Sequence, residues 1–349
     1  MSVAAAQIDA TVASIARVQL PNGAIPWYAG GHVDPWNHVE AAMGLDAGGR
    51  PFEAGRAYRW LRFTQRRDGA WPASVRAGRL QDPTLDANFC AYVAAGVWHH
   101  WLATRDDGFV AELWPVVERA IDFVLDLQSP DGSVCWARDG SYRAWPRALV
   151  TSSSCIHLSL DCAISLAELT GNVRPDWELS LASLADAVAA RPEAFEDKSR
   201  FSMDWYYPVL GGVLRGDAGR ARIDQRWDDF AAEGLGARCV WDRPWVTTAE
   251  TCELALSLDA LGRDDEARSL FDCVHHLRCG EGSYWTGATF PDGTRWPVEQ
   301  TTWSAAAVVL AYEALFGEGA TSGFFRSAGR RSPSALPAPV VSEAVADSL

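Results

Sequence analysis

Two carboxyl-bearing residues stand at the entrances of predicted apolar helices, next to aromatic rings. Asp34 precedes Pro35 and Trp36, and Glu250 lies just after Thr247. Glycoside hydrolysis needs such a pair, because one carboxyl group protonates the leaving oxygen and the other activates water or attacks directly. Each also has a purely structural interpretation, Asp34 as a helix N-cap before proline and Glu250 as the acid of a capping box. Asp34 and Glu250 are therefore candidates for such a pair, with Glu250 as the acid and Asp34 as the base, and the sequence alone allows these two roles to be exchanged.

Aromatic residues are unusually frequent around these carboxyl groups. The 349-residue chain contains 17 tryptophans and one lysine, and its formal net charge is −14. Flat rings suit a sugar, which has apolar faces and a rim of hydroxyl groups. The side chains predicted to bind substrate are Trp27, Trp36, His38, Trp71, Asp86, Asn88, Asp204, Trp205, Tyr206, Trp245, Trp285 and Glu299. Asp204 and Glu299 are the reserve candidates for a catalytic role.

Other catalytic chemistries lack their motifs. The eight cysteines form no C-x-x-C pair and no zinc-like Cys/His spacing, so we predict no metal and no cofactor. The D-x-D-D motif of terpene cyclases is absent, and Asp161 and Cys162 are adjacent, which is not the spacing of a prenyltransferase zinc site. The sequence also lacks the basic patch that a diphosphate would need. An isoprenoid-binding toroid and a non-catalytic glycan-binding protein remain the alternatives.

A repeated phrase reveals the elements that must position these side chains. Each copy follows an amphipathic helix and precedes a loop and a second helix that is apolar on nearly all sides. The copies run from Gln19 to Gly23 and then Trp27, from Gln65 to Gly69 and then Trp71, from Gln128 to Gly132 and then Trp136, and, in degenerate form, from Arg278 to Gly282 and then Trp285. An amphipathic helix covers a surface, whereas an all-apolar helix is buried. Each unit therefore predicts one outer and one inner helix, joined by a turn in which glycine is free to adopt a left-handed conformation.

Six such pairs are predicted. The outer helices fall near residues 4–19, 52–66, 110–128, 176–190, 218–232 and 263–278, and the inner ones near 35–45, 86–104, 153–170, 204–214, 248–262 and 300–316. Closed into a ring, they form an all-α (α/α)6 toroid in which the inner-helix entrances converge on one funnel. An open α-solenoid is the alternative, disfavoured because the inner helices are too apolar for a solvated concave face. We predict one catalytic domain over residues 1–317 and a disordered tail over 318–349.

Charge and hydropathy exclude several partners. An acidic surface repels polyanions, so we expect no nucleic acid and no membrane partner. No run of eighteen apolar residues occurs, and residues 1–20 do not have the pattern of a signal peptide, which predicts a cytoplasmic protein. The expected partner is a neutral oligo- or polysaccharide, and the oligomeric state is left open.

Three segments carry a resemblance to a known family: GGHVDPWNHVE from Gly30, FSMDWYYP from Phe201 and RPWVTTAETCE from Arg243. They resemble an actinobacterial family often labelled prenyltransferase-like, because it shares the toroid, and in particular the methylmannose polysaccharide hydrolases, which are α-endomannosidases. The resemblance covers residues 5–316 in outline. It implies a hydrolase acting on cytosolic 3-O-methylmannose polysaccharide, and by motif it places the catalytic aspartate at Asp34 and the catalytic glutamate at Glu250.

Overall fold

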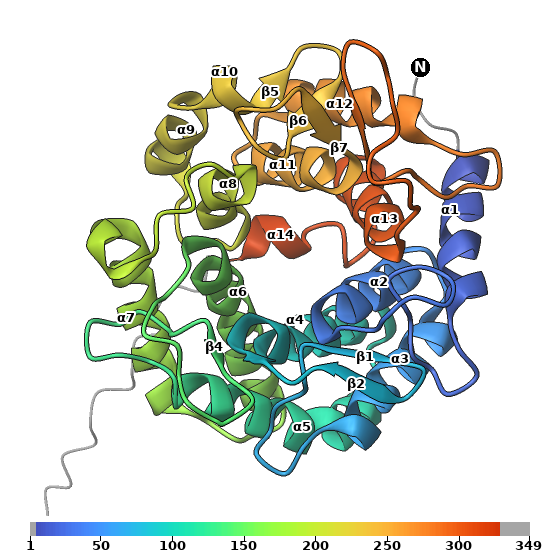
Figure 1. Ribbon diagram of the computed structural model, residues 1–349. Coiled ribbons are helices and arrows are strands. Elements are labelled where there is room, and N and C mark those ends of the chain that lie inside the picture. Colours follow the sequence, from blue (N-terminus) through green and yellow to red (C-terminus); the bar gives the residue numbers. More distant parts are fainter. Residues whose placement is uncertain (1–4, 329–349) are drawn as a thin grey trace, which may run out of the picture.

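The computed structural model describes residues 5–328, and they form a ring of paired helices (Figure 1). The inner helices are α2 (Pro35–Ala47), α4 (Ala87–Thr104), α6 (Val150–Leu169), α8 (Ser202–Leu210), α11 (Thr248–Ala260) and α13 (Thr302–Phe316). The outer helices are α1 (Ala5–Val18), α3 (Pro51–Thr64), α5 (Asp107–Leu125), α7 (Pro175–Ala190), α9 (Gly216–Asp224) and α12 (Asp264–Cys273). Each inner helix packs against the next, and α13 returns to α1 and α2. The ring is closed, which confirms the toroid and excludes the open solenoid.

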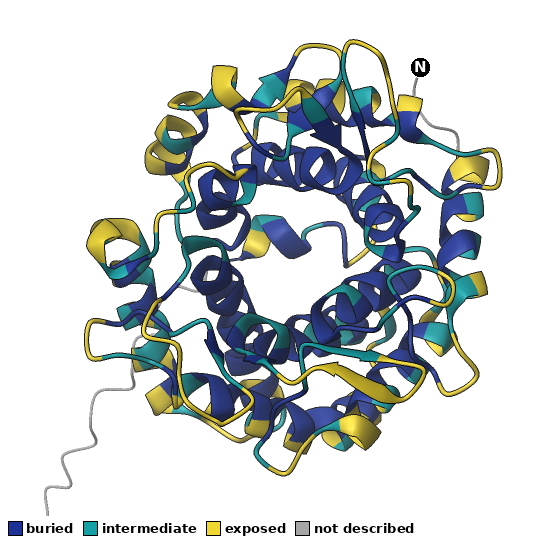
Figure 2. Ribbon diagram, viewed as in Figure 1, coloured by how far each residue is buried: buried dark blue, intermediate teal, exposed yellow. Residues whose placement is uncertain are grey.

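Burial separates the two layers as the hydrophobic pattern predicts (Figure 2). All 13 residues of α11 are buried, whereas the outer helix α3 buries only the face that carries Ala54, Tyr58 and Leu61. The longest inner helix, α6, has the length and mean hydropathy of a membrane-spanning helix, but 89% of its most apolar window is covered by the rest of the ring. Its apolarity is therefore explained by its place in the core.

Short strands tie neighbouring loops together at the mouth, the end of the ring where the inner helices begin. They are β1 (Ser74–Arg76), β2 (Arg79–Asp82), β3 (Leu85–Asp86), β4 (Ala137–Arg138), β5 (Ala231–Ala232), β6 (Gly236–Arg238), β7 (Trp245–Thr247) and β8 (Gly287–Thr289). Strands β5 to β8 form one antiparallel sheet in chain order. Within it, Trp245 of the fifth repeat is paired with Thr289 of the sixth. Loops from adjacent repeats therefore hold each other in place around the funnel.

The repeated Gln-to-Gly phrase acts as a clip between repeats. The side chain of Gln65 donates to the carbonyl of Gly69 in its own turn and to that of Val116 in the next outer helix, α5. Gln19 and Gln128 make the equivalent pair of hydrogen bonds. Gly69 has φ +90°, and a Cβ there would lie 2.1 Å from the carbonyl oxygen of Arg119. Glycine is required both for the left-handed backbone and for this close approach.

The sixth repeat closes the ring with the same device. Gly282 has φ +102°, and a Cβ on it would lie 2.4 Å from the backbone of Ala10 in α1. The degenerate copy of the phrase thus makes the contact between the last repeat and the first, in the way that Gly69 contacts α5.

Several predicted helix ends are wrong. The fourth inner helix ends at Leu210 and not near residue 214, and the third outer helix ends at Leu125 and not near residue 128. The fifth outer helix does not continue to residue 232: it ends at Asp224, and α10 (Trp227–Phe230) follows after Arg226, whose φ of −131° interrupts the helix. The sixth outer helix ends at Cys273 and continues as a 3₁₀ turn, η2 (Val274–Leu277). Another 3₁₀ turn, η1 (Pro192–Ala194), follows α7.

The predicted disordered tail starts too early. Residues 318–328 are folded, and α14 (Phe324–Ser327) lies across the ring opening opposite the mouth (Figure 1). Phe324 and Phe325 are buried, and Arg326 donates to both oxygens of Asp259 in α11. Apolar burial and a buried ion pair fix this segment, which is too short to show helical periodicity in the sequence. Residues 329–349 lie outside the described part of the chain.

Candidate active site

Asp34 caps α2 and keeps one oxygen directed toward other partners. Its Oδ1 accepts from the backbone N of Asn37 at 2.9 Å, which is the predicted N-cap bond. The Asn37 side-chain amide donates to both carboxylate oxygens at 2.8 Å, and Nε2 of His32 lies 3.5 Å from Oδ2. The contact with Asp34 is the main reason why the pKa of His32 is raised. Capping and a chemical role are therefore compatible in this residue, which is only 4% exposed.

Glu250 is buried in the first turn of α11 and does not form a capping box. Thr247 is the N-cap of that helix, but its side chain makes no capping hydrogen bond, and no partner for its Oγ1 is found among residues 5–328. The thiol of Cys239 lies close to the Glu250 carboxylate. Burial, followed by the charge of Glu250, raises the pKa of Cys239, so this thiol stays protonated. The structural interpretation of Glu250 therefore fails, and its carboxylate is free of backbone capping.

A wall of aromatic rings connects the surroundings of Asp34 to those of Glu250. Trp27 stacks on His32, with ring centroids 5.8 Å apart, and packs against Trp303 at 5.7 Å. Trp303 also meets the edge of Trp36 and donates to Glu253, which lies one helical turn below Glu250. The first, fifth and sixth repeats thus meet at the same end of the ring.

Three further predicted carboxyl groups lie at helix entrances around the mouth. Asp86 caps α4, accepting from the backbone of Phe89, and burial together with the nearby charge of Asp34 raises its pKa to about 7. Asp204 lies in the first turn of α8, where burial raises its pKa to about 6. Glu299 accepts from the indole of Trp27 at 3.1 Å.

Three buried polar atoms at these entrances lack partners within the described chain: Oδ1 of Asp204, Oγ of Ser202 and Oδ1 of Asn88. A buried polar atom without a partner is costly, so the site favours a ligand that brings hydroxyl groups. Sugar hydroxyls both donate and accept and meet that requirement.

Two further carboxyl groups, those of Glu40 and Glu253, lie at the floor of the funnel. Tyr92 donates to Glu40, and Tyr206 and Tyr207 both donate to Glu253. Burial raises the pKa of Glu40 to about 7 and that of Glu253 well above its ordinary value. Both serve as hydrogen-bonding residues. They line a cavity of about 10 Å³ with Phe325, enough for one water molecule.

Four predicted substrate-binding residues belong to the core instead. Trp71 and Trp205 are at most 2% exposed and donate to the carbonyls of Leu61 and Arg222 in outer helices. Trp71 fastens its loop to α3 and Trp205 fastens α8 to α9, and their burial leaves no exposed ring face for a sugar. Tyr206 is committed to Glu253.

His38 is the fourth of these core residues. Its Nδ1 accepts from the backbone N of Ile25, so Nε2 carries the proton and donates to the carbonyl of Ala57. Burial lowers its pKa to about 4. A neutral, fully bonded imidazole with no exposed surface cannot contact substrate.

The remaining predicted aromatics lie where a ligand can reach them or close to it. Trp36 is almost buried and lines the cavity below the site, while Trp27, Trp245 and Trp285 are partly exposed. Several strongly exposed rings on the mouth loops are absent from the residues predicted to bind substrate: Trp145, Trp241 and Trp296. Trp296 packs edge-on against Trp245, with centroids 4.6 Å apart. The only sequence signal for them is a tryptophan in a loop with no apolar periodicity around it.

Metal-binding geometry is not found in the described range. No group of three or more His, Cys, Asp or Glu side chains within residues 5–328 is arranged to hold a metal ion. The candidate site is accordingly a set of carboxyl groups, aromatic rings and hydroxyls at one end of the ring.

Comparison with known proteins bears on both fold and family. The sequence matches no family model. A glycosidase structure superposes with a TM-score of 0.71 at 16% identity, covering 89% of this chain and 97% of that one. A D-mannose isomerase superposes with a TM-score of 0.66 at 10% identity, covering 87% of this chain and 96% of that one. At such identities these two structures confirm the toroid fold alone.

A much closer relative determines the family. The MMP endo-(1,4)-3-O-methyl-α-D-mannosidase of Mycolicibacterium hassiacum is 52% identical over 320 residues, which is 92% of this chain and 89% of that protein. This level of identity over nearly the whole ring confirms the resemblance seen in the sequence and the expectation of a glycoside hydrolase. The chain belongs to the family of this endomannosidase.

Proposed function

We propose that the protein is an endo-α-mannosidase that cleaves the α-(1→4) linkages of 3-O-methylmannose polysaccharide. The observation that carries this proposal is the 52% identity, over 92% of the chain, to an enzyme named for that reaction. The mouth suits such a substrate, because its carboxyl groups repel a diphosphate while its rings and unpartnered polar atoms suit a neutral glycan. The isoprenoid alternative has no comparable support.

In the proposed mechanism, Asp34 and Glu250 act on opposite sides of the scissile bond. Asp34 is oriented by Asn37 and His32, which fix the direction of its carboxylate, as a general base requires. Glu250 takes no part in capping α11, and the Cys239 thiol lies beside it, so we assign Glu250 to protonate the leaving oxygen. Trp27, Trp36 and Trp245 supply ring faces beside the bond, and Asp204, Asn88 and Glu299 contact sugar hydroxyls.

The test is the conversion of both carboxyl groups to amides. Asp34→Asn and Glu250→Gln keep size and most hydrogen bonds, and each should lower kcat on methylmannose polysaccharide at least about a hundredfold, the low end for a lost acid or base. The exposed carboxylates Asp217 and Glu233 provide matched controls as Asp217→Asn and Glu233→Gln. A Glu250→Gln variant with normal turnover would remove Glu250 from the mechanism. Turnover of a prenyl diphosphate without glycan cleavage would overturn the proposed function.

A further inference from the structure

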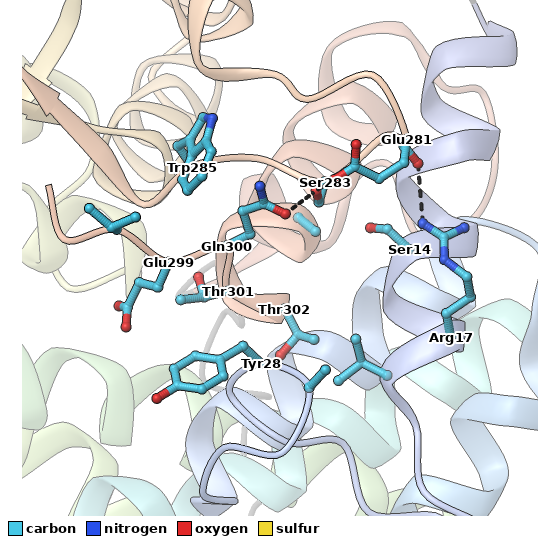
Figure 3. A pocket seen from close by; sticks show the side chains of 14 residues that line it. Ser14, Arg17, Tyr28, Glu281, Ser283, Trp285, Glu299, Gln300, Thr301 and Thr302 are labelled. Carbon is cyan, nitrogen blue, oxygen red and sulfur yellow. Dashed lines mark hydrogen bonds between the residues drawn. The ribbon is translucent and has the colours of Figure 1, made fainter. Parts of the chain in front are cut away.

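A second hollow opens at the mouth, beside the candidate active site. It is a groove of about 700 Å³ between the C-terminal half of α1 and the loop that leads into α13 (Figure 3). Arg17 lies at its outer end, Tyr28 and Trp285 line its middle, and Glu299 lies at its inner end. Such a volume is in the range of ligand-binding clefts.

A series of side-chain contacts links the inner end of the groove to the candidate catalytic centre. Glu299 accepts from Trp27, Trp27 stacks on His32, and Nε2 of His32 lies 3.5 Å from Asp34. A chain bound near Asp34 can therefore continue past Glu299 and out over α1. The sheet pairing of the loops of the fifth and sixth repeats and the packing of α13 on α1 fix the walls of this route.

The lining of the groove suits a neutral, partly apolar polymer. Two carboxyl groups, Glu281 and Glu299, outnumber the single guanidinium of Arg17, which donates to the backbone carbonyl of Glu281. An anionic ligand is therefore disfavoured. The amide oxygen of Gln300 accepts from the Ser283 hydroxyl. These two polar side chains line the groove together with the rings of Tyr28 and Trp285, and they can exchange this hydrogen bond for one to a sugar hydroxyl.

The rim adds an apolar contact. Val298, which is 77% exposed, also lines the groove. An exposed valine in a groove that also contains aromatic rings matches a sugar that carries O-methyl groups better than one that carries hydroxyls alone.

We propose that this groove is a distal subsite that holds mannose units of the glycan chain remote from the scissile bond. The inference rests on the proposed function, because it assumes that the chain cut at Asp34 and Glu250 is a long neutral glycan. Binding of remote units then supplies part of the energy that positions the bond to be cleaved.

The test compares a long and a short substrate on the same variants. Trp285→Ala and Val298→Asp should raise KM for methylmannose polysaccharide about tenfold, the loss typical of a central contact residue. On the shortest oligosaccharide that the wild type cleaves, kcat/KM of the Val298→Asp variant should change less than about twofold, because Val298 is not among the residues placed at the scissile bond. Val298 is so exposed that its substitution leaves the fold intact. Phe63→Ala, at a ring 76% exposed on the outer helix α3, is the matched control and should change neither substrate.

The outcomes separate the distal subsite from the proposed function. Equal losses on both substrates would place Trp285 at the scissile bond and overturn the distal subsite, and so would unchanged kinetics in both variants. If the wild type cleaves neither substrate, the proposed hydrolysis fails. A binding measurement then tests whether the groove holds the polysaccharide. Calorimetric titration of the polysaccharide into Glu250→Gln should then give a Kd that rises about tenfold when Val298→Asp is added, and an unchanged Kd would reject the groove.

Discussion

The two candidate catalytic residues are held in very different ways. Asp34 is fixed by the backbone N of Asn37, by the Asn37 amide on both oxygens, and by His32. Glu250 is in contact with the thiol of Cys239 and has no role in capping α11. A base that positions water must keep a constant orientation, whereas an acid must follow the leaving oxygen as the bond breaks. The asymmetry therefore matches the assignment of Asp34 as base and Glu250 as acid.

Asn37 is accordingly expected to be a positioning residue. Asn37→Ala leaves the backbone cap of α2 but removes the amide that holds both oxygens of Asp34. We expect kcat to fall about tenfold to a hundredfold, because a small misplacement of a catalytic group has effects of that size, while KM changes little. Steady-state kinetics measures both. Asn22→Ala, at an amide that only closes an exposed turn, is the control. A loss confined to KM would show that Asn37 binds substrate.

Glu40 predicts a pH dependence of stability. Its folded-state pKa of about 7 lies above its ordinary value because of burial, with Tyr92 opposing the shift. A raised carboxyl pKa gives stability that is fully present below the unfolded-state pKa and is lost as pH rises through about 7. Between pH 5 and 8 the Tm of Glu40→Gln should therefore rise relative to that of the wild type. The corresponding change in the difference between their unfolding free energies is on the order of 3 kcal/mol.

Comparing the two proteins at each pH removes the contribution of other groups. His38 and His157, whose pKa values burial lowers to about 4, titrate equally in both. Thermal melts at pH 5, 6, 7 and 8 check the prediction. Parallel Tm curves for variant and wild type would mean that Glu40 does not ionise in this range in the folded protein.

At the scale of elements, the clip between repeats predicts an unusually sensitive glycine. A Cβ on Gly69 would lie 2.1 Å from a backbone oxygen of α5, at φ +90°. Gly78, in the β1–β2 hairpin, has φ +73° and no atom within 4 Å of the corresponding position. Gly78→Ala therefore measures backbone strain alone, about 1–2 kcal/mol. Gly69→Ala should cost at least about 3 kcal/mol, because α5 must also move away. Urea unfolding of both variants gives the difference, and equal losses would contradict the clip.

The inner helices could be predicted from sequence because burial on all sides leaves a local pattern. The toroid follows from six repetitions of that pattern. Several helix entrances carry carboxyl groups, and Asp34 and Glu250 could be singled out among them only because their surrounding motifs resemble those of the hydrolase family. The face to which a loop tryptophan turns leaves no such trace. Trp71 and Trp285 follow the same phrase, yet Trp71 donates to Leu61 in the core while Trp285 lines the groove. That difference depends on the packing of neighbouring repeats, which a single sequence does not show.

At the scale of the whole molecule, the ring is closed sideways by the sixth repeat and capped from below by α14. Phe325 lines the cavity that also contains Glu40 and Glu253, so the segment after the ring forms part of the floor of the site. Arg215 extends from the loop after α8 to the carbonyls of Phe325 and Ala328. The floor is therefore assembled from residues more than 280 positions apart in the sequence, Glu40 and Phe325.

Removal of α14 should destabilise the entire ring. A chain that ends at Gly323 loses two buried phenylalanines and leaves Asp259, which is 6% exposed, without Arg326. Each buried ring contributes about 1.5–3 kcal/mol and an unpaired buried carboxylate adds a further cost, so unfolding free energy should fall by at least about 3 kcal/mol. A chain that ends at Ala328 keeps every one of these contacts and is the matched control. Calorimetry should show a lower Tm for the shorter chain alone, and Asp259→Asn should recover part of the loss because it removes the unpaired charge. Identical Tm values for the two truncated chains would show that the inner helices close the floor without α14.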